Sequence, residues 1–194
     1  MRKTRFLTVC ILGLTWAIFA VLLFPACSIN VKKEKGGEDK QVDINTPVGG
    51  IHVSKDADVA DIGLAVYPGA RQKEKDLSGD SKSANVNISG FGYGLKVVAV
   101  EFESADPPAK IISFYQGQLK KYGDVLLCHT SHLDVDTDVK DGSHELTCEG
   151  SSGRNTELKV GTKENQHIVA VESAGQGSSF SLVYVRTHGK EADI

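Results

Sequence analysis

The sequence predicts an α+β fold in which an antiparallel β-sheet packs against one amphipathic helix. Apolar and polar residues alternate with a period of two through most of residues 42–190, as they do in half-buried strands. Glycine-rich turns separate these stretches, and only residues 107–122 show the longer period of a helix. About 150 residues are enough chain for one hydrophobic core, so we expect residues 42–190 to form a single domain.

The N-terminus has the layout of a membrane segment. Three basic residues, at positions 2, 3 and 5, precede an apolar run without charge from Phe6 to Phe24. As a helix this run would be about 28 Å long, close to a hydrocarbon core of ~30 Å, so it is long enough to serve as an uncleaved transmembrane anchor. The alternative is a lipoprotein signal, because Ala26 and Cys27 end a segment similar to a lipobox in which Cys27 is lipidated. Free secretion after cleavage is a third possibility, and residues 1–27 are in each case a signal or an anchor.

Two cysteines indicate on which side of the membrane the domain lies. Basic residues flank the apolar run on both sides in nearly equal number, so charge does not fix the orientation. Cys128 and Cys148 form an even pair within the domain, which is typical of an oxidising compartment, and we expect a disulfide between them. The domain is therefore predicted to be anchored to the cell membrane or envelope and to lie in the periplasm or outside the cell.

The rest of the chain contains more acidic than basic residues. An acidic exported domain repels phosphate backbones, so nucleic acid is not an expected partner; the membrane, an envelope protein or a cell-wall ligand is. Residues 28–41 are charged and contain a glycine pair, which predicts a flexible tether that spans about 20 Å. Residues 191–194 form a short tail.

The strands can be placed from their alternation. We expect a small separate hairpin first, then a hairpin with a glycine-punctuated aromatic tip at residues 90–94, and finally a C-terminal antiparallel meander. The expected strands are residues 42–44 and 51–53, then 84–89 and 95–102, then 158–160, 167–171 and 180–185.

The helix is the best-specified element in the sequence. Asp106 suits the N-cap position, Pro107 suits the first helical position, and Gly123 can end the helix in a left-handed conformation. One apolar stripe recurs at helical spacing and is expected to pack against the sheet. It consists of Ile111, Ile112, Tyr115, Leu119 and Tyr122.

A series of motifs around this helix resembles a known small domain. The series begins with Tyr67-Pro68-Gly69-Ala70, continues with Ser104-x-Asp106 and Phe114-Tyr115, and ends with Leu119 and Gly123. It is similar to a domain of uncharacterised bacterial exported, membrane-anchored and lipoprotein-like proteins. The resemblance implies an α+β fold and brings no activity with it.

The segment between the two cysteines contains the residues with most chemical potential. Asp134, Asp136, Asp138 and Glu145 have the spacing of positions one, three, five and twelve of a calcium loop. The sixth position of that loop is normally glycine and here is Val139, and no amphipathic helices flank the segment. A solvated hairpin that turns at residues 141–142 is the simpler interpretation. A third possibility is a transition-metal site, which would use His129, His132 or His144.

No catalytic motif accompanies these features. The sequence has no Gly-x-Ser-x-Gly, no His-Glu-x-x-His and no Cys-x-x-Cys. His52, His167 and His188 stand singly, where a surface or hydrogen-bonded role is the ordinary case. We therefore expect a non-catalytic envelope protein, a binding or structural module without a cofactor. The alternatives are a calcium-binding module that uses residues 134–145 and an envelope hydrolase without a recognisable motif.

Overall fold

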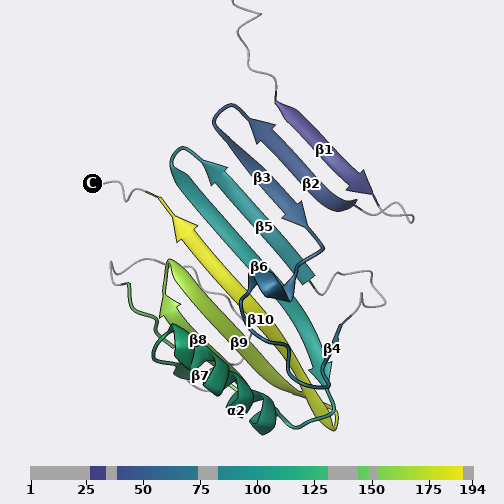
Figure 1. Ribbon diagram of the computed structural model, residues 1–194, viewed down its shortest axis with the longest axis vertical. Coiled ribbons are helices and arrows are strands. Elements are labelled where there is room, and N and C mark those ends of the chain that lie inside the picture. The colour runs from purple at the N-terminus through teal and green to yellow at the C-terminus, as the bar shows by residue number, and fades with distance from the viewer. Residues whose placement is uncertain (1–26, 34–38, 74–82, 131–143, 149–152, 190–194) are drawn as a thin grey trace, which may run out of the picture.

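The strands of the computed structural model, which describes residues 27–33, 39–73, 83–130, 144–148 and 153–189, form one antiparallel sheet (Figure 1). Ten strands are present in the described part, in the order β1-β2-β3-β5-β6-β10-β9-β8-β7, with β4 paired to β6. The predicted fold of an antiparallel sheet with one helix is thus confirmed. The strands are β1 (Ser28–Lys33), β2 (Asp39–Thr46), β3 (Gly49–Ser54), β4 (Arg71–Gln72), β5 (Ser83–Gly90), β6 (Tyr93–Ser104), β7 (Leu126–Thr130), β8 (Asn155–Thr162), β9 (Asn165–Ala174) and β10 (Gly177–His188).

The predicted tether at residues 28–41 is wrong where the structure describes it, because that stretch contains β1 and the start of β2. Strand β1 pairs with β2 so that Ile29 faces Ile44 and Val31 faces Val42. Composition suggested a linker because the lysines and glycines hide the short alternation at Ile29 and Val31. The hairpin β2–β3 is likewise not separate, since β3 pairs with β5 and extends the main sheet.

The other two strand groups match the sequence prediction. Strands β5 and β6 form the expected hairpin, which closes at the pair Gly90 and Tyr93. Strands β8, β9 and β10 form the expected meander. Strand β10 then pairs with β6 along its length, from Ser178 beside Ser104 to His188 beside Gly94, and so joins the hairpin and the meander into one sheet.

The helix α2 (Pro108–Leu119) continues into a short 3₁₀ turn, η2 (Lys120–Tyr122), and ends at Gly123 with a positive φ. Ile111, Tyr115 and Leu119 are buried, as predicted, whereas Ile112 is half-buried and Tyr122 is exposed. The residue at the N-cap position is Pro107 and makes no side-chain capping bond. Asp106 is therefore not the N-cap, because its carboxylate binds other partners, which are described below.

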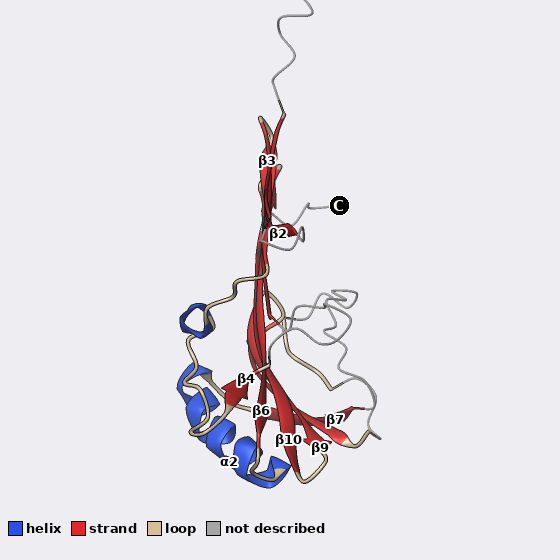
Figure 2. Cartoon of the chain, turned by 90° about the vertical axis from the view of Figure 1, so that its right-hand side faces the viewer, coloured by secondary structure: helices blue, strands red, loops and turns tan. Residues whose placement is uncertain are grey.

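Among the described residues, only one end of the sheet has a second layer on the side where α2 lies, which we call the helix face (Figure 2). Helix α2 and the segment between β3 and β4, which contains η1 (Val59–Asp61), pack there on β6, β8, β9 and β10. Ile62 and Leu64 of that segment are buried in the same core as the helix stripe. The remaining core residues are Val98, Val100, Phe102, Leu158, Val160, Val169, Val171, Phe180 and Leu182.

The rest of the sheet extends beyond this core as a single layer. We call β1, β2, β3 and β5 the one-layer region, and β6–β10 with α2 the covered region. In Figure 2 the upper part of the sheet, around β2 and β3, has no helix or described loop against either face. Within the described part of the chain this region therefore lacks the second layer that normally buries the apolar face of a sheet.

Candidate functional site

The two cysteines of the domain are joined. Cys128 lies on β7, and its disulfide to Cys148 brings the two Cα atoms to 5.3 Å, which confirms the predicted bond. The cross-link closes a loop of 20 residues in sequence and restricts the unfolded chain. It links β7, the edge strand of the covered region, to the segment that contains Cys148.

The predicted metal site falls largely outside the described residues and stays a prediction. Asp134, Asp136 and Asp138 lie outside the described residues, as does His132, while Glu145 and His129 are exposed. The Nδ1 atom of His144 lies 2.7 Å from the Oε1 atom of Glu164. Within the described ranges no three His, Cys, Asp or Glu side chains come together as metal ligands do.

The residues of the Tyr-Pro-Gly-Ala and Ser-x-Asp motifs meet at the start of α2. The hydroxyl of Tyr67 donates to Asp106 Oδ2 at 2.9 Å, and Lys110 Nζ donates to Asp106 Oδ1 at 2.6 Å. The backbone N–H of Tyr67 donates to the buried hydroxyl of Tyr115 at 3.1 Å. Ser178 donates to the carbonyl oxygen of Asp106 at 2.7 Å. These contacts fasten the segment before β4 to the helix and to β10.

The electrostatics of this cluster agree with a structural role. The hydrogen bonds from Lys110 and Tyr67 hold the pKa of the Asp106 carboxyl below its ordinary value. Its negative charge in turn raises the pKa of Tyr67, chiefly through their hydrogen bond, while burial raises the pKa of Tyr115. Each group is thereby kept in its ordinary charge state, and none is prepared to exchange a proton.

A carboxylate–imidazole pair lies on the helix face of the one-layer region. Asp43 on β2 and His52 on β3 are cross-strand partners, and the Oδ1 atom of Asp43 contacts Nδ1 of His52. Gln41 also donates to Asp43 Oδ2 at 2.9 Å. The hydrogen bond with His52 lowers the pKa of Asp43. Among the described contacts none joins His52 to a serine or cysteine, so the pair lacks the nucleophile of a hydrolytic site.

The opposite face of the one-layer region, which we call the distal face, is apolar. Cross-strand partners point to the same side of a sheet, so the register aligns four isoleucines in one row: Ile29 on β1, Ile44 on β2, Ile51 on β3 and Ile88 on β5. A second row aligns four valines of the same strands, Val31, Val42, Val53 and Val86.

These two rows remain partly exposed. Ile29 is 67% exposed and Ile51 is 39% exposed, although both lie within regular strands. In the covered region the same face contains Ile168, Val183 and Val185, which are buried. A contiguous apolar surface left open to solvent commonly marks a site for a protein, a ligand or a membrane.

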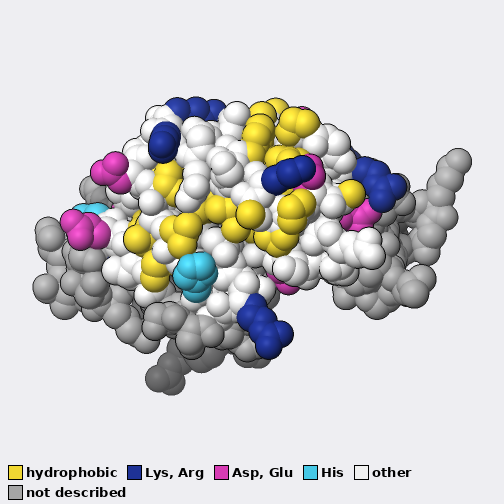
Figure 3. Space-filling model, turned by 90° about the horizontal axis from the view of Figure 1, so that it is seen from below, with side chains coloured by type: hydrophobic (Ala, Val, Ile, Leu, Met, Phe, Trp, Pro, Cys, Tyr) yellow, Lys and Arg dark blue, Asp and Glu magenta, His cyan; other side chains and the backbone are white. Residues whose placement is uncertain are grey.

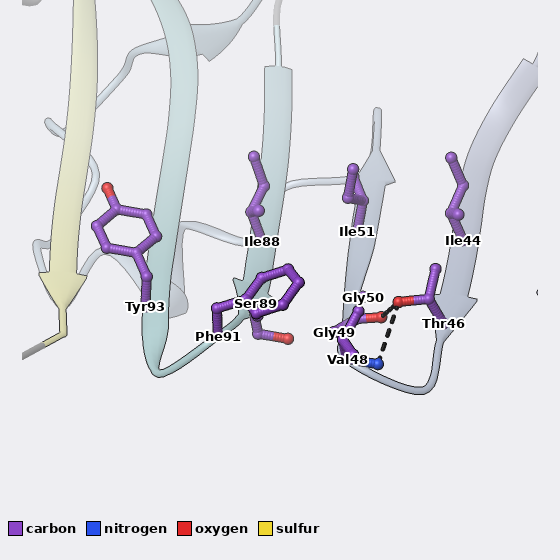
Figure 4. Close-up of a pocket in the computed structure, with 11 residues that line it drawn as sticks. Ile44, Thr46, Val48, Gly49, Gly50, Ile51, Ile88, Ser89, Phe91 and Tyr93 are labelled. Atoms are coloured by element: carbon purple, nitrogen blue, oxygen red, sulfur yellow. Dashed lines mark hydrogen bonds between the residues drawn. The ribbon is translucent and has the colours of Figure 1, made fainter.

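Three residues of the isoleucine row, Ile44, Ile51 and Ile88, line a hollow at one end of this face (Figure 4). The hollow has a volume of about 270 Å³ and lies where the β2–β3 and β5–β6 hairpins turn. In Figure 4, Ile44, Ile51 and Ile88 stand side by side on neighbouring strands, with the rings of Phe91 and Tyr93 next to them. The full lining is Ile44, Thr46, Val48, Gly49, Gly50, Ile51, Ile88, Ser89, Gly90, Phe91 and Tyr93.

The two turns beside the hollow are held together by backbone contacts. Gly49 pairs with Gly90, and a Cβ atom added to Gly49 would lie 2.1 Å from the carbonyl oxygen of Ser89. The N–H of Phe91 donates to the carbonyl oxygen of Val48 at 3.2 Å. We call residues 46–49 and 90–93 the tip edge. Glycine at position 49 is thus required by close backbone approach, and it keeps the two turns in fixed register.

The tip edge lies where the chain leaves the predicted anchor. Ser28, the first residue of β1, pairs with Asn45, one residue before the last residue of β2. Cys27 is exposed and directly precedes β1. The apolar run at residues 6–24 lies outside the described residues, and among those described no helix is long and apolar enough to cross a membrane.

The far end of the molecule has a different surface. Seen from below, that end shows lysine, arginine, aspartate and glutamate side chains around its apolar side chains (Figure 3). By contrast, residues 44–51 and 86–95, which contain both turns of the tip edge, include no charged residue in a chain of which 24% is charged. This absence of charge was readable in the sequence, but the proximity of the two turns was not.

The comparisons with known proteins return nothing. No protein family, curated protein or solved structure matches this chain. The arrangement of its own residues is therefore the basis for assigning a function.

Proposed function

We propose that this chain is a non-catalytic module of the bacterial cell envelope, anchored through residues 1–27, which binds an apolar partner through its distal face. The globular domain lies outside the cytoplasm in this proposal. The resemblance in the Tyr67 and Asp106 motifs to exported, membrane-anchored proteins supports it, as does the disulfide between Cys128 and Cys148, which suits an oxidising compartment.

The observation that carries the proposal is the exposed apolar face of the one-layer region. Burial of apolar surface stabilises a complex by roughly 25 cal/mol per Å², and a strand side chain such as Ile51 contributes in full only when something covers it. The hollow at the end of this face is lined almost entirely by apolar and glycine residues. The hollow offers hydrophobic contact to a partner. Apart from the hydroxyls of Thr46, Ser89 and Tyr93, its lining residues contain no acidic, basic or nucleophilic side chain.

Cysteine protection in the native envelope tests the proposal. Ile51→Cys places a thiol on the distal face, and the matched variant Asn87→Cys places one on the helix face of the neighbouring strand β5; both native side chains are exposed. We expect a water-soluble maleimide to label the thiol at position 51 at least tenfold more slowly in envelopes than in purified protein. The thiol at position 87 should react at similar rates in both, after subtraction of the labelling of the parent chain.

The opposite result would reject the proposal. If the thiol at position 51 reacts in the envelope as fast as in purified protein, nothing covers the distal face there. The domain would then be a spacer or a structural element without a docking surface on this side.

A further inference from the structure

The most unusual residue of the tip edge is Phe91, at the turn between β5 and β6. Its side chain is 90% exposed, and its φ of 52° is the only positive φ of a residue other than glycine among those described. The next residue, Gly92, also has a positive φ of 82°, so two left-handed residues form the turn. Such turns favour Asn-Gly or Gly-Gly, because a bulky side chain with positive φ strains the backbone.

This position is therefore unfavourable for phenylalanine in water on two counts. The ring exposes apolar surface, and its backbone holds a conformation that asparagine would adopt at lower cost. Strain of this kind persists where the surroundings impose it, and it gathers at binding sites. Transfer of the ring into an apolar medium would offset both costs.

Other exposed apolar side chains surround Phe91 along the tip edge. Val48 is 55% exposed and Tyr93 is 51% exposed, and both line the hollow with Phe91. The backbone hydrogen bond between Phe91 and Val48 fixes the two turns relative to each other, so their side chains present one preformed surface. The nearest charged residues along the two hairpins are Asp43 and Lys96, each outside the uncharged stretches.

The position of this surface indicates what it meets. Strand β1 starts beside the β2–β3 turn, so Cys27 leaves the sheet at the same end as the tip edge. Strands lie roughly 4.8 Å apart, and three spacings separate β1 from β5, so Phe91 stands within about 15 Å of the first strand across the sheet. An anchor that ends at Cys27 brings this end of the sheet to the membrane surface.

We propose that the tip edge docks on the lipid bilayer that holds the N-terminus, with Phe91, Val48 and Tyr93 inserted at the level of the headgroups and upper acyl chains. This inference deepens the proposed function and rests on the anchoring it contains. A lipid interface accepts aromatic and aliphatic side chains and excludes unpaired charge, which matches the composition of both turns. The opposite end of the sheet, at Ser104, then lies away from the bilayer, because β6 runs from Tyr93 to Ser104, a length of about 36 Å at ~3.3 Å per residue.

Quenching of a single tryptophan by brominated lipid tests the insertion in the full chain. Trp16, the one tryptophan of the sequence, is first replaced by phenylalanine. Phe91→Trp then places the reporter at the tip edge, and Gln176→Trp, in the exposed turn between β9 and β10, is the matched control at the far end of the sheet. Each chain is reconstituted in phosphatidylcholine vesicles whose acyl chains are brominated near the headgroup.

We expect the emission of the reporter at position 91 to fall at least twofold relative to vesicles without bromine, and that of the reporter at position 176 to change by less than a tenth. Equal quenching at the two positions, or none at position 91, would overturn the inference. A protein partner or a second copy of this chain on the distal face would leave the reporter at position 91 unquenched in vesicles that contain only lipid.

A second variant separates docking from folding. In a chain with Trp16→Phe and Val48→Trp, the further change Phe91→Asn should reduce quenching of the reporter at position 48 and at the same time raise the melting temperature. The opposite signs follow because asparagine relieves the backbone strain but cannot insert into the acyl chains. Unchanged quenching at position 48 would show that Phe91 does not hold the edge on the bilayer.

The result is distinguishable from the test of the proposed function. Protection of the thiol at position 51 in the envelope, together with an unquenched reporter at position 91, would retain the apolar docking face and reject lipid as its occupant. Rapid labelling at position 51 with strong quenching at position 91 would retain the lipid contact and confine it to the tip edge.

Discussion

The one-layer region and the covered region are built from the same alternation of apolar and polar residues, yet they bury it to different degrees. Val98 of β6 is 0% exposed, whereas Ile51 of β3 is 39% exposed. The helix face of β6–β10 is buried because α2 and the segment before β4 pack on it, whereas no described element packs on the distal face of the one-layer region. Among the described residues the one-layer region is held by strand pairing and by polar side-chain contacts such as the Asp43–His52 pair, and it contributes no residue to the buried core clusters, so it can present its apolar side to an external partner.

The largest expected effect is the loss of a core side chain in the covered region. Ile111→Ala should lower the free energy of unfolding by about 2–5 kcal/mol, because it leaves a cavity under the helix. Ile51→Ala removes the same atoms from the one-layer region and should cost less than about 1 kcal/mol, since its side chain is already partly in water. Urea denaturation of the purified protein measures both.

The exposed Lys120 provides a control near the same helix. Lys120→Ala should change the free energy of unfolding by no more than about 0.5 kcal/mol. Similar losses for Ile111→Ala and Ile51→Ala would show that the one-layer region is as well packed as the rest, and the contrast between the regions would fail.

The two edge strands of the sheet give the next comparison. Strand β7 is fixed by the disulfide of Cys128, whereas β1 is paired to β2 only. Replacement of Cys128 and Cys148 together by serine should lower the free energy of unfolding by roughly 3 kcal/mol. Hydrogen exchange should accelerate for the amides of β7 and stay unchanged for those of β1. Equal acceleration at both edges would mean that the bond supports the whole sheet.

Removal of a single tyrosine hydroxyl compares the covered region with the tip edge, with a smaller expected change in the free energy of unfolding. Tyr67→Phe removes the hydrogen bond to Asp106 and should cost about 1 kcal/mol in thermal or urea unfolding. Tyr93→Phe makes the same chemical change at the exposed tip edge and should cost less than about 0.3 kcal/mol. A larger effect at Tyr93 than at Tyr67 would contradict the structural role assigned to the motif cluster.

The smallest expected difference is in pH dependence. Burial lowers the pKa of His167, which stacks on Tyr122, below its ordinary 6.5. The folded state therefore resists protonation there, and stability that is present above pH 6.5 should fall as the pH drops below it. His167→Gln should flatten this part of the curve of unfolding free energy against pH.

The Asp43–His52 pair of the one-layer region should affect the free energy of unfolding in a lower pH range than His167 does. The hydrogen bond from His52 lowers the pKa of Asp43 below its ordinary 3.8, so its stabilising effect is present above that pH and lost only as the pH falls further. Asp43→Asn should leave the curve between about pH 5 and pH 7 less affected than His167→Gln does. If Asp43→Asn flattened the curve of unfolding free energy near pH 6.5 and His167→Gln did not, the pH dependence in that range would belong to the Asp43–His52 pair and not to His167.

The order of the strands was harder to predict than the strands themselves. Alternation is a local property, so β5, β6 and β8–β10 could be located from the chain, as could α2 from its apolar stripe. The pairing of β6 with β10 joins segments that are far apart in the sequence, such as Ser104 and Ser178, and no local pattern specifies it. Strand β1 was missed because its charge composition is that of a linker, and it becomes a strand only where β2 offers an unpaired edge.

For the candidate site, the sequence by itself determined the chemistry of the parts. These are two uncharged turns, the alternating apolar residues of each strand, and two cysteines that are expected to bond to each other. Only the tertiary structure decided which parts meet. The backbone hydrogen bond from Phe91 to Val48 places two turns that are distant in the sequence on one edge. The register of β1 puts Cys27 at that same end. Side-chain chemistry can be read from the residues themselves, whereas burial and proximity depend on long-range pairing, and here that pairing leaves one apolar face of the sheet without a second layer among the described residues.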